Sequence, residues 1–569
     1  MSEQKPVTLR WELETDASID ATWALFGDTD RYNRAVGFGF QFTEEPRPDG
    51  TVVRKGHAKA LGVVNLTWEE RPFRYRVPEW FQSTRLFEGG PAERLVTSLN
   101  LEARGGRTHI TYVIEVYPRS FMARPVVSLE LKRVTKPKID AVISIMLSRL
   151  AGSSDQYDPL PAPLSRAAEE RVLQKVPRIP PPIGERLATL VREAPLYEQA
   201  RIHPLQTAER WDLNDDQVLD AFLKAVHEGF LELWWDLLCP LCKGSKERVQ
   251  SLAQLQPQVH CPSCNIVYDG TFPDSVVVSF KPAPDIRDFE VDVACLGSPY
   301  RQPHVLAQDR LEPSGTCVLK VKLAEGAYRI RTQPGRESVS LMVREGAPDD
   351  PIRLRVQDTF GPSRVTCPPG EVTVTIENYM KQPLEILLEE RSMPSGVLTM
   401  GRLLERPGAK ELLPEQAMMP GMDVHTRKGA VLAVEALDPG AMAEARAQVE
   451  RANPRAISAA ATTLVAVWAD FAEAMRVASV LSAAPDLQVA LNTGPVAEVT
   501  LGERTLPVGS VVEAALGALV GAAQHHAAIP VDRAEAPEVR DAMGLNASLV
   551  KVGFALTSGV RVHWIKFEG

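Results

Sequence analysis

Hydrophobic and polar residues alternate along several stretches of the first 150 residues. VTLRWELE, VVNLTWEE and THITYVIEVY place apolar side chains at every second position, as expected of strands with one buried face. A helix is predicted over SIDATWALFGDTDRYNR, with Ser18 as its N-cap. A second helix closes the segment, because apolar residues recur there at helical spacing: Ile139, Val142, Ile143 and Met146. Pro137 indicates that this helix is kinked or begins late.

The rest of the chain divides by its local patterns into further segments. Residues 152–183 are rich in proline and small polar residues and are predicted to form a linker. Residues 184–238 are helical and winged-helix-like, with the clearest helix running from the cap Asn214 to the stop Gly229. Short apolar runs separated by Gly/Pro turns predict a β-sandwich over 269–392. A helical lead-in over 393–424 and a mixed α and β domain over 425–569 follow, so the predicted fold class is multidomain α+β.

Composition and charge exclude several classes of function. The 569 residues have a formal net charge of −9, which weighs against a polyanionic partner. Between Leu205 and Asp236 the acids Glu209, Asp212, Asp215, Asp216, Asp220, Glu228, Glu232 and Asp236 face only Arg210 and Lys224, so the winged-helix-like segment is not expected to bind nucleic acid. No segment is apolar over the length that spans a bilayer, and the start has no secretory signal pattern. A cytoplasmic location is therefore expected.

Two cysteine pairs give the most specific local pattern. Cys239 and Cys242 form one C-x2-C turn, and Cys261 and Cys264 form another. Two such turns can complete a tetrahedral shell of four thiolates around a structural Zn²⁺ ion, so residues 239–268 are predicted to be a zinc ribbon. Two disulfides or four unmodified thiols are the alternatives. Cys295, Cys317 and Cys367 are isolated and are expected in cores.

Residues 1–151 resemble the helix-grip, or START-like, fold, through the order strand, helix, several strands and closing helix. The resemblance implies a cavity for a small hydrophobic ligand between the sheet and the closing helix. Aromatic candidates to line the cavity are Trp11, Trp23, Trp68, Phe73, Trp80 and Phe87. The alternative is that these residues are ordinary core.

The segment VALNTGPVAEVTLGERTLPVGSVV, residues 489–512, resembles class III adenylyl/guanylyl cyclases, and the resemblance extends over about 395–569. It implies a ferredoxin-like α/β fold for the C-terminal domain. The family's two metal-binding aspartates fall at Glu435 and Thr462, with Asp438 at a family glycine. Its purine-selecting Lys and acid fall at Ser458 and Leu506, and the Asn and Arg that stabilise the transition state fall at Glu513 and Gly517.

These substitutions predict a cyclase-like domain without catalytic residues. Two-metal chemistry requires clustered carboxylates and a cation at the developing phosphate charge, and neither set is complete here. Family domains pair head to tail, so the partners expected are a second copy or another cyclase-type domain.

The upstream block over about 184–400, with PHVLAQ and GAYR, resembles an uncharacterised module that precedes cyclase domains in some bacterial proteins. The chain is thus expected to be a signalling protein and no enzyme. The alternatives are an active cyclase that uses Glu435 and Asp438, and a carrier of a small hydrophobic ligand.

Overall fold

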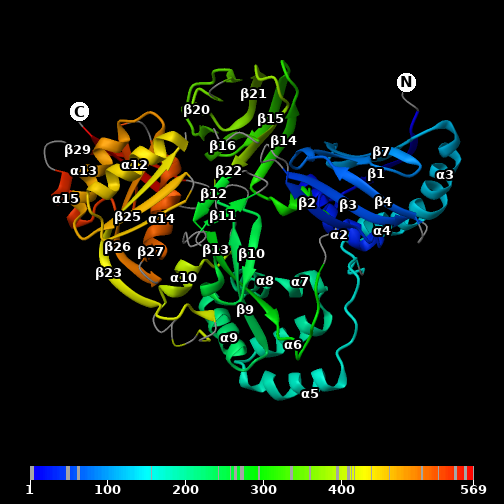
Figure 1. Cartoon of the computed structure of the whole chain (residues 1–569), viewed down its shortest axis with the longest axis horizontal. Coiled ribbons are helices and arrows are strands. Elements are labelled where there is room, and N and C mark those ends of the chain that lie inside the picture. The colour runs from blue at the N-terminus through cyan, green and yellow to red at the C-terminus, as the bar shows by residue number, and fades with distance from the viewer. Residues whose placement is uncertain are drawn as a thin grey trace. The chain divides into compact units, whose positions relative to one another are not determined.

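Two compact units make up the chain in the computed structural model (Figure 1). The first comprises Met1–Pro161, Glu290–Leu311 and Glu385–Leu388, and the second comprises Ala162–Phe289, Glu312–Leu384 and Glu389–Gly569. The structure describes residues 5–567 except 47–51, 61–63, 156, 241–242, 257, 262–265, 270–274, 292–294, 296, 334–337, 358–359, 392–395, 407–410, 412, 415–416, 438, 461, 502–503, 523–524, 544–546 and 556–560. The chain is multidomain and mixes helices with strands, as predicted.

An antiparallel sheet forms the body of the first unit. Its strands run in the order β1-β8-β7-β6-β5-β14, and β4, β3 and β2 continue from β6. The bounds are β1 Val7–Thr15, β2 Gln41–Pro46, β3 Val52–Ala60, β4 Val64–Glu70, β5 Arg74–Arg76, β6 Trp80–Phe87, β7 Ala92–Arg104, β8 Arg107–Pro118 and β14 Val305–Leu311. The alternating stretches of the sequence are therefore strands.

Helices pack on this sheet at both ends of the N-terminal segment. Helix α1 (Ile19–Phe26) begins at Ser18, whose side chain accepts a hydrogen bond from the Ala21 N–H, and α2 is Thr29–Val36. The closing helical segment consists of η1 (Phe121–Ala123), α3 (Arg124–Leu129), the π-helical turn η2 (Glu130–Thr135) and α4 (Lys136–Leu150). Pro137 lies in the first turn of α4, directly after the π-helical turn, so the helical segment continues through it. The predicted irregularity is thus the π-helical turn just before it.

The second unit begins with a helical segment that packs on a three-stranded sheet. The helices are α5 Arg166–Lys175, α6 Ile183–Glu193, α7 Leu196–Ala200, α8 Pro204–Trp211 and α9 Asp215–His227. Asn214 caps α9 by accepting from the Gln217 N–H at 3.1 Å, as predicted. The sheet has the order β10-β9-β13, with β9 Leu231–Leu238, β10 Ser245–Val249 and β13 Val276–Pro282, and β11 (Gln258–Cys261) and β12 (Ile266–Asp269) form a separate hairpin. Helix α5 lies within the range 152–183 that the sequence assigns to a linker.

The range 269–392 contains the predicted short strands, but they do not all join one body. Four form a sheet in the order β15-β21-β18-β19, and β16, β17 and β20 pair in that order. Their bounds are β15 Thr316–Leu323, β16 Gly326–Gln333, β17 Ser338–Val343, β18 Ile352–Val356, β19 Phe360–Gly361, β20 Arg364–Cys367 and β21 Gly370–Asn378, followed by β22 Leu384–Glu390. Strand β13 instead pairs with β9, and β14 belongs to the first unit. Pairings over such sequence separations leave no local pattern, which is why the predicted boundaries miss them.

The C-terminal segment is a sheet covered by helices on both faces. The sheet order is β24-β25-β23-β26-β28-β30-β29, with β27 paired to β26. Leu432 and Val434 of β23 pack with α12 and α13, whereas Val431 and Ala433 pack with α14 on the other face. The bounds are α10 Met400–Leu404, β23 Asp423–Ala436, α12 Pro439–Arg451, β24 Ala456–Ala459, β25 Thr463–Trp468, α13 Phe471–Ser482, β26 Leu487–Leu501, β27 Arg504–Val508, α14 Ser510–Ala518, β28 His526–Pro530, α15 Pro537–Met543, β29 Ala547–Ala555 and β30 Arg561–Phe567.

Across the described residues, no helix combines the length and the apolar character that a bilayer crossing requires.

Candidate functional site

Glu435 and Thr462, the two positions predicted to replace metal-binding aspartates, lie next to each other. Glu435 is near the end of β23 and pairs across the sheet with Thr463 of β25. The N–H of Ala436 donates to the carbonyl oxygen of Thr462 at 2.9 Å. The structure therefore brings the two predicted positions together, but only one of them carries a carboxylate.

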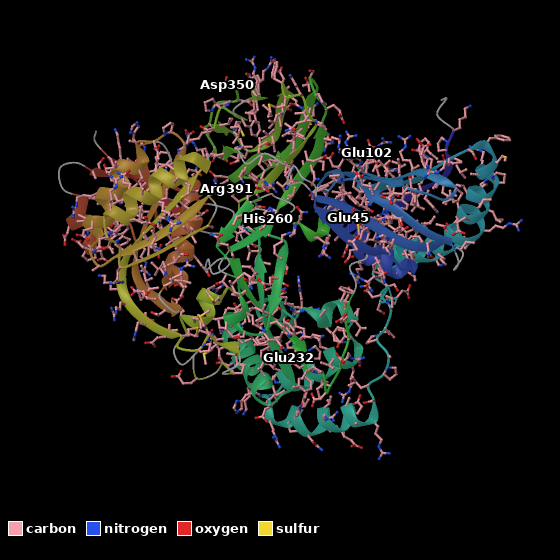
Figure 2. All side chains as sticks on the ribbon, viewed as in Figure 1. Glu45, Glu102, Glu232, His260, Asp350 and Arg391 are labelled. Carbon is pink, nitrogen blue, oxygen red and sulfur yellow. The ribbon has the colours of Figure 1, made fainter. Side chains whose placement is uncertain are left out.

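The carboxylate of Glu435 is buried against two arginines of the same unit. It forms an ion pair with Arg391, which follows β22, and both side chains are 8% exposed. Arg329 of β16 approaches the other oxygen, with Nη1 3.8 Å from Oε1. Arg391 lies between β16 and the C-terminal sheet, and its N–H donates to the Ala327 carbonyl at 3.0 Å (Figure 2). Burial, followed by the neighbouring Arg329 charge, lowers the pKa of Arg391 to about 9.

The ion pair continues into a larger buried polar cluster. Glu389 is fully buried and accepts from Arg329 Nε at 2.5 Å and from Arg331 Nε at 3.0 Å. Arg391 Nη1 donates to Gln488 at 2.7 Å, and Gln488 donates to Ser340 at 3.2 Å. Three guanidinium groups thus surround two carboxylates in a nearly water-free space. Such an array is costly to break, because removing one partner leaves a buried charge uncompensated.

This cluster is a poor site for a divalent cation. At 4 Å and an effective dielectric constant of 20, a doubly charged ion and a guanidinium repel each other by about 8 kcal/mol. A cation on Glu435 would meet that repulsion from both Arg391 and Arg329. Asp438, the other acid considered, lies outside the described residues.

The second half of the predicted site lies on α14 and contacts the lead-in helix α10. Glu513 accepts a hydrogen bond from the Thr399 hydroxyl, the N-cap of α10. Glu405 accepts from the Ser510 N–H at 2.5 Å and from its hydroxyl at 2.7 Å, so its charge lies at the N-terminus of α14. Gly517 is half-buried and supplies no cation.

Two glycines permit this close contact. A Cβ at Gly401 would lie 2.9 Å from the Gly509 nitrogen, and a Cβ at Gly509 would lie 2.9 Å from Glu405 Oε2. Gly509 also has φ +106°, a conformation that side chains rarely adopt. The two positions that the resemblance matches to purine-selecting residues are core in this chain: Leu506 is fully buried and Ser458 is 2% exposed.

The prediction of a zinc cofactor is wrong for the part of the chain that the structure describes. No group of three or more His, Cys, Asp or Glu side chains within them could hold a metal ion. Cys239 and Cys261 are buried, whereas Cys242 and Cys264 lie outside the described residues. The C-x2-C spacing identifies two turns and does not establish that they share an ion. The three isolated cysteines are buried, as predicted: Cys295, Cys317 and Cys367.

The aromatic residues predicted to line a cavity lie mostly in the core of the first unit. Trp11, Trp23, Trp68 and Phe73 are buried, whereas Trp80 and Phe87 are half-buried. Trp68 Nε1 donates to Glu70 Oε2 at 2.7 Å, and Arg85 Nε donates to the same oxygen at 3.0 Å. Glu70 Oε1 is buried and accepts no hydrogen bond from any residue that the structure describes. The interior therefore contains a polar acceptor among the aromatic rings.

The arginines Arg391, Arg329 and Arg331 are the site residues that sequence reasoning missed. A signal was present in GAYRIRT, where two arginines stand at alternate positions on either side of Ile330. Alternation places both on one face, and seven of the eight residues of β16 are buried. Two buried cations on one face require nearby carboxylates.

Comparisons with known proteins give one family match. A model described as "Family of unknown function (DUF5939)" matches residues 169–294, which is less than half of the chain. No curated protein matches the chain significantly.

Solved structures resemble parts of the chain at low similarity. The Zhui aromatase/cyclase from Streptomyces sp. R1128 is 15% identical, covers 26% of this chain and 94% of its own, and has a TM-score of 0.20. A protein from Thermus thermophilus is 12% identical, with coverages of 26% and 100% and a TM-score of 0.20. The catalytic core of a rhodopsin-guanylyl cyclase is 12% identical, with coverages of 26% and 99% and a TM-score of 0.21. Similarities at these identities and TM-scores do not indicate a function.

Proposed function

We propose that this chain is a cytoplasmic regulatory protein whose cyclase-like C-terminal domain makes no cyclic nucleotide and acts by protein association. The observation that carries the proposal is the buried ion pair between Glu435 and Arg391. In class III cyclases this position holds a catalytic metal. Here an internal cation neutralises it, and a threonine stands at the second metal position.

The second half-site supports the same proposal. A transition state for phosphoryl transfer gains from cations aimed at its developing charge. Gly517 has none to offer, and Glu513 adds a negative charge that is already engaged by Thr399. The alternative of an active cyclase would need both half-sites to be rebuilt.

The same contacts bear on how such a domain would associate. In the family, the partner domain faces the metal carboxylates with one half-site and the Asn/Arg helix with the other. In this chain, Arg391 lies against Glu435, and α10 lies against α14 through Thr399 and Glu405. We infer that these internal segments compete with a partner, either a second copy or another cyclase-type domain.

A second candidate function is the binding of a small amphipathic ligand by a helix-grip first unit. The specific observation in its favour is the buried acceptor Glu70 Oε1 beside Trp68. A ligand with an apolar body and one donor group would satisfy it, because a buried acceptor without a partner costs about 1–3 kcal/mol. Binding there would control the C-terminal domain only through different affinities for its two states.

Two measurements test the main proposal. The purified full chain is expected to form no cyclic AMP or cyclic GMP from ATP or GTP with Mg²⁺ or Mn²⁺. Product that disappears on Glu435→Ala would refute the non-catalytic assignment.

Association is tested separately by sedimentation velocity, alone and with a purified class III cyclase catalytic domain. Glu405→Ala should strengthen association relative to the wild type, and Arg446→Ala at an exposed position of α12 is the matched control. A chain that stays monomeric and binds no cyclase domain in all three forms would refute the proposed mode of action.

A further inference from the structure

Exposed apolar side chains gather where the closing helical segment of the first unit begins. Phe121 and Met122 are 77% and 79% exposed, and Val126 and Leu129 are 49% and 52% exposed. Figure 1 shows α3, the helix that carries the last two, at the edge of the first unit. A single exposed apolar side chain is ordinary, but four within nine residues form a patch that calls for an explanation.

The four side chains do not face the core of their own unit. Val126 and Leu129 are three residues apart and share one face of α3. Val127 and Leu131, on the opposite face, are 4% and 5% exposed and anchor the segment to the core. The segment thus has two apolar faces, one buried and one turned outward. We name the outward set Phe121, Met122, Val126 and Leu129 the apolar edge.

Basic residues lie in the same segment as the apolar edge. From Arg119 to Lys138 the segment has six basic residues and the single acid Glu130, a local charge of +5 in a chain of net charge −9. Arg119, Arg124 and Lys136 are engaged with backbone carbonyls or with Asp140. Lys132, Arg133 and Lys138 are exposed and form no ion pair with any residue that the structure describes. We call these three the basic set.

We propose that this segment docks the protein on a membrane surface that contains anionic lipids. An interfacial segment needs aromatic and aliphatic side chains that enter the acyl boundary, and cations that meet the headgroups. The apolar edge and the basic set supply both on one continuous helical segment. Charge complementarity with the basic set selects an anionic surface, and the acidic remainder of the chain, which such a surface repels, is expected to face away from it.

A second copy of the chain fits this surface less well. A stable protein interface buries about 800 Å² on each partner, which four side chains do not provide. The like charges of the basic set would also repel each other across a two-fold contact. The inference is independent of the proposed cyclase-like function.

Co-sedimentation of the full chain with vesicles of phosphatidylcholine and phosphatidylserine, and with phosphatidylcholine alone, tests the proposal. Binding is expected only to the anionic vesicles and should weaken with salt. The triple variant Lys132→Ser, Arg133→Ser, Lys138→Ser should lower partitioning on the order of a hundredfold, at about fivefold per cation. The control triple Lys322→Ser, Arg353→Ser, Lys381→Ser gives the same net charge of −12 but should keep wild-type binding.

The apolar contribution is tested by Phe121→Ser with Met122→Ser, against Val318→Ser with Val480→Ser at exposed positions elsewhere. Only the first pair should reduce vesicle binding. Absence of binding to anionic vesicles, equal binding to neutral ones, or equal effects of the two triples would overturn the proposal. The proposal would also be overturned if the chain bound no vesicles and formed a dimer in solution that dissociates when Phe121 and Met122 are substituted.

Discussion

The side chain of Arg391 forms a buried ion pair with Glu435, the residue that the resemblance to class III cyclases matches to a metal-binding aspartate. The two residues come from different parts of the second unit, because Arg391 follows β22 and Glu435 lies near the end of β23. The pair therefore connects the segment that follows β22 to the C-terminal sheet. The pair also neutralises the carboxylate of Glu435 inside the protein.

The first prediction concerns the energy of this pair. Arg391→Met alone should lower the free energy of unfolding by about 3–5 kcal/mol, because Glu435 would remain buried without its main partner. The double variant Arg391→Met with Glu435→Met should recover most of the loss, since a buried pair is often replaceable by apolar residues. Urea denaturation of the two single variants and the double variant gives the coupling energy.

The control for this cycle is the exposed pair Arg446 and Glu450 on α12, whose side chains are 58% and 49% exposed. Alanine at Arg446 should cost at most about 0.5 kcal/mol. Additive effects of the Arg391 and Glu435 substitutions would contradict the assigned pair.

The pairing of Glu435 and Thr462 as two related positions came from the resemblance to class III cyclases, whereas the surroundings of Glu435 were not predicted. Alternation of apolar and polar residues is a local pattern, so strands such as β1 and β8 could be predicted directly. The arginines that neutralise Glu435 lie 44 and 106 residues earlier in the chain, and no local pattern joins them to it. Long-range strand pairing decides such contacts, as it also decides that β14 pairs with β5.

The lead-in helix gives a second case of the same limit. Its helical character was predicted over 393–424, but α10 spans only Met400–Leu404 among the described residues. That Glu405 would reach the N-terminus of α14 could not be foreseen, because capping by a distant residue leaves no spacing to detect. The zinc prediction also rested on spacing alone, which does not by itself establish that two C-x2-C segments share an ion.

The second prediction uses Gly401 of α10. Alanine normally stabilises a helix relative to glycine by about 1 kcal/mol. Gly401→Ala should nevertheless lower the melting temperature, because the new Cβ would lie 2.9 Å from the Gly509 nitrogen. Gly39→Ala is the control, since no atom lies within 4 Å of its Cβ. A stabilised Gly401→Ala variant would show that α10 does not pack against the start of α14.

A third prediction concerns the cap on α14. Glu405→Ala removes two hydrogen bonds to Ser510 and a negative charge at the helix N-terminus. The expected loss is about 0.5–2 kcal/mol, as for other N-terminal caps, measured by thermal or urea denaturation. Glu405→Gln should lose less, because its amide oxygen can still accept one bond. Equal losses for both variants would indicate that the charge and not the geometry matters.

The last prediction is a pH dependence at the start of the segment that matches the family model. Glu169 of α5 accepts hydrogen bonds from Arg192 of α6, with Oε2 2.7 Å from Nη2, and this bond lowers the pKa of Glu169 below its usual 4.5. An acid whose pKa falls on folding stabilises the protein above its ordinary pKa, and the contribution disappears as the pH falls through the folded value. Glu169→Gln should therefore lower the melting temperature at pH 7, with a difference from wild type that shrinks below about pH 4.5.

Glu170→Gln, which affects only an exposed pair with Arg166, should show a small difference throughout. A Glu169→Gln difference that stays constant from pH 7 to pH 3 would mean that the ion pair does not stabilise the contact between α5 and α6.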